Sequence, residues 1–276
     1  MRIRSRTRLL AVVGAPIAHS LSPRMQNAAI AALGLDAVYV ALETPAGALD
    51  LVVRGVLATG GAVNVTVPHK RAVVALLEEP SELVRRTGAC NTVWAGLRGI
   101  SGENTDVPAI RVEAARLLGG RPMRRAVVAG TGGSARAAAA AIAGEWPGAP
   151  VSILSRDPGR AADFLAWAAT VGIPAGTEDA DGADLVVNAT PLGLSASDPL
   201  PISAALLSGR RPAAVLDLVY VRGRTRLVRD ALASGIAAED GRGVLVEQGA
   251  AAFRCFFDVE PPREVMRAAV EDALGG

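Results

Sequence analysis

In the middle of the chain, residues 130–135 are Gly-Thr-Gly-Gly-Ser-Ala, and glycines at this spacing can form a turn that binds phosphate groups. The segment follows an apolar run and opens an alanine-rich stretch, a context typical of a strand-to-helix turn that binds a dinucleotide. The glycines permit the tight turn and let a pyrophosphate approach the backbone, and the helix N-terminus offers free N–H groups to the phosphates. A glycine-rich turn that binds nothing is the alternative, but the flanking strand and helix favour binding.

Two arginines indicate which dinucleotide this is. The next apolar run, Val151–Leu154, ends before Ser155, and Arg156 and Arg160 follow closely. A ribose 2′-hydroxyl is commonly bound by an acidic residue about 20 residues beyond the glycines, whereas a 2′-phosphate is bound by arginine. Asp157 stands between the two arginines and would suit the ribose of NAD. We predict NADP as the cofactor, with NAD as the weaker alternative.

Polar residues also gather where strands of the first part of the chain are expected to end, at the edge where open α/β sheets bind ligands. The segments are residues 14–23, 64–70, 88–93 and 102–106. They contain Lys70 and Asp106. A lysine amine can give a proton to an oxygen or take one from it, and a nearby carboxylate can orient both groups. Taken alone, Lys70 is more typical of a surface helix and Asp106 of a helix cap, so the assignment depends on the segments around them.

Short apolar runs alternate with helical patterns along the chain, which predicts βαβ units and an α/β fold with mostly parallel sheets. The expected strands are Leu9–Val13, Ala37–Leu42, Ala62–Val65, Arg125–Ala129, Val151–Leu154, Leu185–Asn188 and Ala214–Leu218. The expected helices are Ser22–Leu33, Ala46–Ala58, His69–Leu77, one from the glycine turn to Ala143, Gly243–Phe257 and Glu264–Ala273. The last two helices have no strand of their own, so we expect them to return to the first domain.

The length and apolar content of the chain predict two domains. With 276 residues, 50% of them hydrophobic, the chain exceeds the usual length of one domain and can bury a large core. We expect an N-terminal α/β domain for substrate binding and catalysis, formed by residues 1–105 plus 242–276. Residues 106–241 are expected to form a Rossmann-type NADP-binding domain.

Charge and cysteine content exclude several classes of function. Basic and acidic residues nearly balance, at 29 and 27, which provides no general positive field for a nucleic acid. Cys90 and Cys255 lie far apart and form no Cys-x-x-Cys or Cys/His cluster, so neither a metal site nor a disulfide framework is expected. The apolar runs are too short for a signal peptide or a membrane span. We expect a cytoplasmic protein that binds small molecules.

The polar segments and three later ones, residues 188–194 (NATPLGL), 217–220 (DLVY) and 245–250 (LVEQGA), resemble in order and spacing the family of shikimate and quinate dehydrogenases. The resemblance extends over nearly the whole chain. It implies an NADP-dependent oxidoreductase of chorismate and aromatic amino acid biosynthesis that reversibly reduces 3-dehydroshikimate to shikimate, as a monomer or homodimer. In such an enzyme the hydride belongs to the cofactor, while the protein orients the reactants and moves the proton.

The same resemblance implies roles for individual residues. Lys70 matches the catalytic lysine, and Asp106 matches an acid that orients it and also binds substrate. Ser20 and Ser22 match a hydroxyl pair for the substrate carboxylate. Because Ser22 precedes Pro23 it is also a predicted N-cap, which makes Ser20 the stronger candidate. The other implied substrate-binding residues are Thr66, Asn91, Tyr220 and Gln248. The implied cofactor-binding residues are Gly130, Thr131, Gly132, Gly133, Ser134, Ala135, Ser155, Arg156, Arg160, Thr190, Leu218 and Gly241.

Three positions depart from the family pattern. Gln26 stands where histidine is usual, Ser155 where asparagine is common, and Val244 where methionine is frequent. These departures bear on cofactor affinity and preference rather than on the reaction.

Two alternatives stay open. Within the family, quinate or an aminoshikimate is the alternative substrate. Outside it, the alternative is a non-catalytic redox sensor that binds a dinucleotide, and such a protein would show no change in nicotinamide absorbance with any ring acid. The presence of both Lys70 and Asp106 argues against a sensor.

Overall fold

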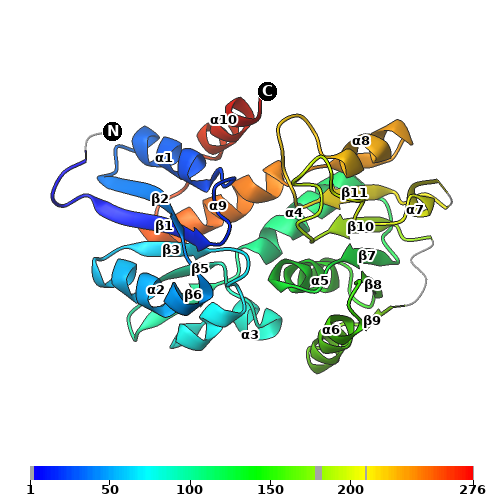
Figure 1. Ribbon diagram of the computed structural model, residues 1–276, viewed down its shortest axis with the longest axis horizontal. Helices are drawn as coiled ribbons and strands as arrows, with labels where there is room; N and C mark the ends of the chain where they lie inside the picture. Colours follow the sequence, from blue (N-terminus) through cyan, green and yellow to red (C-terminus); the bar gives the residue numbers. More distant parts are fainter. Residues whose placement is uncertain (1–2, 178–181, 209, 276) are drawn as a thin grey trace. The chain divides into compact units, whose positions relative to one another are not determined.

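The computed structural model describes residues 3–177, 182–208 and 210–275, and these divide into two compact units (Figure 1). The N-terminal unit contains the described residues up to Thr105 and those from Leu245 onward, and the second unit is Asp106–Val244. Each unit is built on one six-stranded sheet covered by helices, so the predicted α/β class is confirmed. The second boundary falls inside a helix, three residues beyond the predicted Gly241.

The sheet of the N-terminal unit is mixed. Its order is β2-β1-β3-β5-β6-β4, in which β1, β2 and β3 are parallel and β5 runs antiparallel to both neighbours. Because β5 is reversed, its beginning lies at the same edge as the ends of β3 and β6. The strands are β1 (Arg8–Gly14), β2 (Ala37–Glu43), β3 (Ala62–Val65), β4 (Glu79–Pro80), β5 (Thr92–Ala95) and β6 (Ile100–Glu103).

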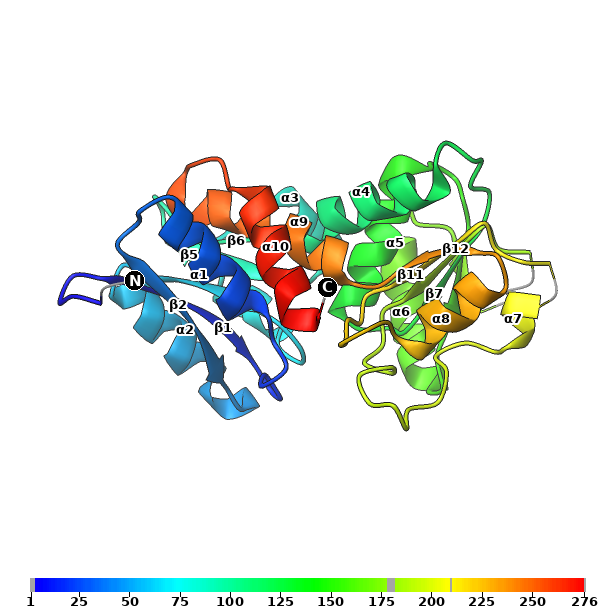
Figure 2. The same ribbon diagram turned by 90° about the horizontal axis from the view of Figure 1, so that it is seen from above.

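Helices cover both faces of this sheet. Its helices are α1 (Ser22–Ala32), α2 (Leu49–Ala58), α3 (Glu82–Thr87), α9 (Arg242–Phe257), α10 (Arg263–Leu274) and the 3₁₀ helices η1 (Ala46–Ala48) and η2 (Ala72–Leu76). Alternate residues of β1 point to opposite faces, and Ala11 and Val13 share a core with Leu49 and Val53 of α2. Helices α1 and α10 lie side by side in both views (Figures 1 and 2). Each fully buried Val or Leu contributes about 1.5–3 kcal/mol.

The predicted helix His69–Leu77 is wrong. The structure has a turn over residues 67–70 and then only the short 3₁₀ helix η2, because the α-helical bond from Val73 to the carbonyl of His69 is not continued and Val74 bonds three residues back to Arg71. The predicted helix over residues 46–58 divides into η1 and α2. The short elements β4, α3, β5 and β6 were not predicted.

The second unit has the strand order of a Rossmann fold. The order is β12-β11-β10-β7-β8-β9, all parallel, and it reverses between β7 and β10, which is the switch point where such sheets bind ligands. Strands β7, β10 and β11 are buried throughout, as a parallel sheet covered on both faces requires. The strands are β7 (Ala126–Ala129), β8 (Val151–Leu154), β9 (Ala175–Gly176), β10 (Leu185–Asn188), β11 (Ala214–Asp217) and β12 (Ala237–Glu239).

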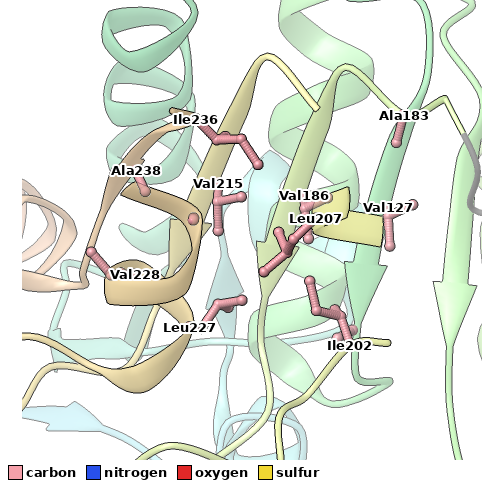
Figure 3. Packing of buried hydrophobic residues seen from close by; sticks show 12 residues of the cluster. Val127, Ala183, Val186, Ile202, Leu207, Val215, Leu227, Val228, Ile236 and Ala238 are labelled. Atoms are coloured by element: carbon pink, nitrogen blue, oxygen red, sulfur yellow. The ribbon is translucent and has the colours of Figure 1, made fainter. Parts of the chain in front are cut away.

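Two layers of helices enclose this sheet. They are α4 (Asp106–Leu118), α5 (Gly133–Glu145), α6 (Pro158–Thr170), α7 (Ala205–Ser208) and α8 (Arg226–Ala233). Helices α4 and α5 pack against each other. Val186 of β10 and Val215 of β11, two neighbouring strands, pack in one apolar cluster with Leu227 of α8 and Leu207 of α7 (Figure 3). None of the helices in the described ranges combines the length and the apolar character that crossing a membrane requires.

Candidate active site

The turn that carries Lys70 is hydrogen-bonded to other segments of the N-terminal unit. The N–H of Cys90 donates to the carbonyl of Lys70 at 2.7 Å, which fixes the lysine backbone beside the start of β5. The buried ring of His69 donates from Nε2 to the carbonyl of Thr44 at 2.6 Å. The side chain of Lys70 is half-buried. Lys70 is therefore held on a braced turn and not on the surface helix that sequence alone favours.

Gly14 allows the end of β1 to approach this turn. A Cβ at Gly14 would lie 2.5 Å from Cγ2 of Thr66 and 2.9 Å from the carbonyl oxygen of Val67. The N–H of Thr66 donates to the carbonyl of Val13 at 2.9 Å. The predicted residue Thr66 thus stands directly beyond β3, at the edge that also carries Lys70.

Asn91 links three segments at this edge. Its Oδ1 accepts from the backbone N–H of Thr105 at 2.8 Å, and its Nδ2 donates to Thr105 Oγ1 at 2.9 Å. The same nitrogen lies 3.4 Å from Oε1 of Gln248 in α9, whose own Nε2 donates to the carbonyl of Leu245. The structure therefore brings the predicted residues Asn91 and Gln248 together. Asn91 precedes a strand, whereas the sequence predicts that its segment follows one, and the reversed direction of β5 places it at the same edge as the ends of β3 and β6 nonetheless.

Asp106 directly follows Thr105 and is the first residue of α4. It is buried, with 7% of its surface exposed. A carboxylate in the first turn is stabilised by the helix dipole, and this helix role is compatible with a role toward a ligand.

The two serines have the opposite backbone roles to those predicted. The N-cap of α1 is Leu21, and Ser22 is the first helical residue, whose side chain makes no capping bond. The predicted N-cap Ser22 is therefore wrong, because the chain enters helical geometry one residue earlier. Ser20 Oγ instead accepts from the N–H of Ser22 at 3.3 Å. Ser22 is thus the hydroxyl that the helix leaves unused, although it is largely buried.

The glycine turn of the second unit stands where a dinucleotide phosphate would fit. Gly130 has φ +111°, and a Cβ there would lie 2.9 Å from the carbonyl oxygen of Ala189 on the loop after β10. Gly132 is the N-cap of α5, and a Cβ on it would meet no atom within 4 Å. Open space in front of a helix N-terminus is what an approaching phosphate needs. Thr131, Gly133 and Ser134 continue the turn, and the small, fully buried Ala135 lets α5 pack closely on the sheet.

The two predicted arginines differ in their surroundings. Arg156 is exposed at the end of β8, and no described side chain forms an ion pair with it. Asp157 is the N-cap of α6: its Oδ1 accepts from the N–H of Arg160 at 3.1 Å, and its Oδ2 lies 3.4 Å from Arg160 Nε. Ser155 Oγ bonds the backbone of Asp157 at both N and O. Asp157 is therefore occupied as a cap, which reduces its availability to a ribose.

A buried polar network joins the ends of β10 and β11. Asn188 Nδ2 donates to Asp217 Oδ1 at 2.7 Å, and the same oxygen accepts from the N–H of Val219 at 3.0 Å. Thr225, the N-cap of α8, donates its hydroxyl to Asp217 Oδ2 at 2.7 Å. Burial raises the pKa of the Asp217 carboxyl to about 6, against the lowering effect of these three hydrogen bonds.

This network positions the loops that contain the remaining predicted residues. Thr190 donates its hydroxyl to Asn188 Oδ1 at 2.7 Å, and the N–H of Leu218 donates to the carbonyl of Asn188 at 2.9 Å. A Cβ on Gly241 would lie 2.3 Å from the carbonyl oxygen of Leu218. Tyr220 follows on the same loop and is half-buried.

Sequence reasoning did not assign Asn188, Asp217 or Thr225 to any role. Both Asn188 and Asp217 lie in segments quoted for the resemblance, and a buried amide and carboxylate at strand ends were the available signal. Among the described residues, no group of three or more His, Cys, Asp or Glu side chains is arranged to hold a metal ion. Cys90 and Cys255 are not joined in a disulfide.

Lys70 is the only lysine of the chain, and the other basic residues that make up the total of 29 are all arginines. A guanidinium stays protonated at every pH that proteins tolerate, whereas an amine can release its proton. Since arginine occupies every other basic position, Lys70 carries the one side-chain amine of the chain.

The geometry can be compared with that of known proteins. Residues 12–93 match the family model of the shikimate dehydrogenase substrate binding domain, and residues 241–271 match that of the shikimate 5′-dehydrogenase C-terminal domain. The chain is 42% identical to a protein of Rubrobacter xylanophilus named shikimate dehydrogenase (NADP(+)), over 98% of this chain and 97% of the relative.

Solved structures show the same likeness. A shikimate dehydrogenase in complex with NADP+ has a TM-score of 0.88 and 30% identity, covering 100% of this chain and 98% of the other. The shikimate 5-dehydrogenase of Thermus thermophilus, in complex with NADP(H) and shikimate, has a TM-score of 0.81 and 37% identity, covering 96% of this chain and 99% of the other.

Proposed function

This chain belongs to the shikimate dehydrogenase family, and from that premise we propose that it is an NADP-dependent shikimate dehydrogenase, which reversibly reduces 3-dehydroshikimate to shikimate. The family predicted from the ordered motifs is confirmed. The observation that carries the assignment of the chemistry is the single lysine, braced on a turn beside Asn91.

Proton transfer is the step that the protein itself must provide. Reduction of the ketone develops negative charge on its oxygen, so a donor within hydrogen-bond reach lowers the barrier, and the same group accepts the proton in the reverse direction. We assign this role to Lys70. Asp106 is assigned to orient the lysine and the reacting hydroxyl, since a carboxylate can accept from both.

Substrate recognition is assigned to hydroxyl and amide side chains, one carboxylate and one tyrosine. Ser20 and Ser22 would bind the carboxylate, which lies away from the reacting carbon. The ring hydroxyls would be bound by Thr66, Asn91, Asp106 and Gln248, with Tyr220 as a further contact. The support is the shared position of Thr66, Asn91 and Gln248 at one edge of the sheet.

Cofactor binding is assigned to the second unit. When bound, NADP supplies or accepts the hydride. The turn from Gly130 to Ala135 would hold the pyrophosphate at the N-terminus of α5, and Arg156 with Arg160 would bind the 2′-phosphate. The loop residues Thr190, Leu218 and Gly241 would line the rest of the cofactor site. The capping role of Asp157 supports NADP over NAD, because its Oδ1 already accepts from the backbone N–H of Arg160.

We further propose that the enzyme works in the cytoplasm in chorismate and aromatic amino acid biosynthesis, as a monomer or homodimer. Its two cysteines, which form no disulfide, suit a reducing compartment. Quinate and aminoshikimate stay the alternative substrates, because nothing in the described side chains separates ring acids that differ in one substituent.

The single lysine gives a direct test. An amine-directed acylating reagent can modify only Lys70 and the N-terminal amine, and intact-mass measurement followed by peptide mapping counts each. Oxidation of shikimate by NADP+ is followed by nicotinamide absorbance. We expect activity to fall in proportion to acylation of Lys70 and shikimate to protect that site. Protein acylated at the N-terminus alone is the matched control. Full activity after complete acylation of Lys70 would remove it from the mechanism, and absence of turnover in the unmodified chain would favour the sensor.

A further inference from the structure

Tyr39 places a buried hydroxyl next to the ligand edge from two strands away. Tyr39 in β2 pairs with Leu10, and Asn64 in β3 pairs with Val12, on the two sides of the central strand β1. Since Leu10 and Val12 are two residues apart on one strand, all four side chains point to the same face. The Tyr39 hydroxyl reaches across β1 and donates to Asn64 Oδ1 at 2.7 Å. Asn27 of α1 bonds both backbone groups of Tyr39, which fixes the position of the ring.

Two partners engage the Asn64 amide: the carbonyl of Asn91 can only accept, which fixes the side of Nδ2, and the Tyr39 hydroxyl supplies the donor for Oδ1. With its oxygen engaged by Tyr39, Asn64 directs Nδ2 toward the carbonyl of Asn91 at 3.0 Å and toward Thr92 Oγ1 at 3.1 Å. Because Thr92 Oγ1 accepts there, its own proton is available to Asn91 Oδ1, 3.1 Å away. Tyr39, Asn64, Thr92 and Asn91 are all less than 8% exposed, so water does not replace a lost bond easily.

The last member of the chain is the residue assigned to substrate. Asn91 Oδ1 accepts from Thr92 and from the backbone of Thr105, so its oxygen faces inward. Its amide nitrogen consequently donates to Thr105 Oγ1 at 2.9 Å and also lies toward Gln248. The backbone N–H of Thr105 fixes the direction of the Asn91 amide because it can only donate, and the chain from Tyr39 through Asn64 holds the hydroxyl of Thr92 as a second donor to the same oxygen.

We propose that Tyr39 is a positioning residue for substrate binding: acting through Asn64 and Thr92, it secures the second donor to Asn91 Oδ1 and so restricts the position of the Asn91 N–H that faces Gln248, from which a ring hydroxyl would accept. The inference rests on the proposed function of Asn91. Tyr39 would thus influence substrate binding without contacting the substrate. Its ring fills the core, whereas its hydroxyl takes part in the hydrogen-bond network that ends at Asn91.

Tyr39→Phe removes the hydroxyl and keeps the ring. Asn64 then loses the donor to its oxygen, its bond to Thr92 Oγ1 is held less firmly, and the second donor to Asn91 Oδ1 is weakened. Loss of a neutral hydrogen bond corresponds to about a threefold to tenfold change in affinity. We expect the KM for shikimate to rise by that factor, while the KM for NADP+ and kcat stay within about twofold.

A double-mutant cycle with Asn91→Ala separates positioning from general weakening of the fold. If Tyr39 acts through Asn91, Tyr39→Phe has no further effect on the KM for shikimate in the Asn91→Ala background. The matched control is Ser101→Ala, which removes a different hydroxyl of the same sheet, bonded to Glu79 at 2.9 Å. It should leave the KM for shikimate unchanged even where it lowers the unfolding temperature.

A readout without turnover completes the test. In ¹⁵N-labelled protein, Tyr39→Phe should shift the side-chain amide signals of Asn64 and Asn91 and leave those of Asn104, which donates to Thr87 and Ala89, in place. If the wild-type protein does not oxidise shikimate, the proposed function fails, while these shifts still support the hydrogen-bond chain from Tyr39 to Asn91. Unmoved Asn91 signals, or an equal rise in KM with and without Asn91, would overturn the inference.

Discussion

The buried carboxyl of Asp217 makes a quantitative prediction for stability. Its pKa is raised by burial from 3.8 to about 6, so the folded protein holds this proton over a range in which the unfolded chain has released it. Where the folded state binds more protons, the free energy of unfolding falls as pH rises. The gap of about two pH units corresponds to about 3 kcal/mol, about half of which is lost between pH 5 and pH 8.

Asp217→Asn removes the titration and keeps the shape. The amide retains an oxygen for Asn188 and Val219, and its nitrogen would face Thr225 Oγ1. We expect the free energy of unfolding of the variant, minus that of the wild type, to increase by about 1–2 kcal/mol from pH 5 to pH 8, because only the wild type pays the ionisation cost.

The assay is urea unfolding without ligands, followed by tryptophan fluorescence in a Trp94→Phe background. Trp146 and Trp167 then remain as reporters, and both lie in the same unit as Asp217. Asp198→Asn is the matched control. Backbone N–H groups of Ser195 and Gly193 lower the pKa of Asp198, so this carboxyl stays ionised from pH 5 to pH 8. The free energy of unfolding of Asp198→Asn, minus that of the wild type, should therefore not change with pH over this range. If the corresponding difference in the free energy of unfolding for Asp217→Asn also does not change with pH, the reasoning is refuted.

The other predictions concern catalysis and ligand binding. Lys70→Ala should lower kcat by roughly 10²- to 10⁴-fold and change the KM for shikimate only modestly, as steady-state kinetics would show; near-normal turnover would contradict the assignment. Ser20→Ala and Ser22→Ala should each raise the KM for shikimate by about tenfold or more with little effect on kcat, since the carboxylate is bound alike throughout the reaction; an unchanged KM removes that serine from the site. Arg156→Ala should weaken NADP+ selectively, and equal loss with NAD+ would reverse the cofactor assignment. Asp157→Thr should widen the preference for NADP+, because threonine can still cap α6 while the like charge beside the phosphate is gone; a narrower ratio of kcat/KM values would count against it.

Strands with dense apolar runs could be predicted from the sequence. The short strands and the networks between strand ends could not, because they depend on which strands pair with each other. Val151–Leu154 and Leu185–Asn188 occur as predicted, because a buried parallel strand leaves a continuous apolar signal. The hairpin that positions Asn91 was missed, since its strands are short and partly polar. Its reversed direction, which brings Asn91 to the ligand edge, is a property of the sheet and not of any local segment.

The polar networks escaped prediction for the same reason. Asn188 and Asp217 are 29 positions apart, and they meet only because β10 and β11 pair in a register that places them opposite each other. Tyr39 lies in an apolar run where an aromatic residue is ordinary strand composition, and its bond to Asn64 depends on the order β2-β1-β3. The solitary lysine, by contrast, is visible in the sequence itself.

The most direct test of the account is a comparison of kcat/KM for shikimate and quinate, each with NADP+ and NAD+, on the purified chain. The account predicts the highest value for shikimate with NADP+, a loss on replacing shikimate by quinate, and a separate loss on replacing NADP+ by NAD+. A higher kcat/KM for quinate or for NAD+ would contradict the proposed substrate or cofactor respectively, and no turnover in any of the four combinations would contradict the assignment as a dehydrogenase of these ring acids.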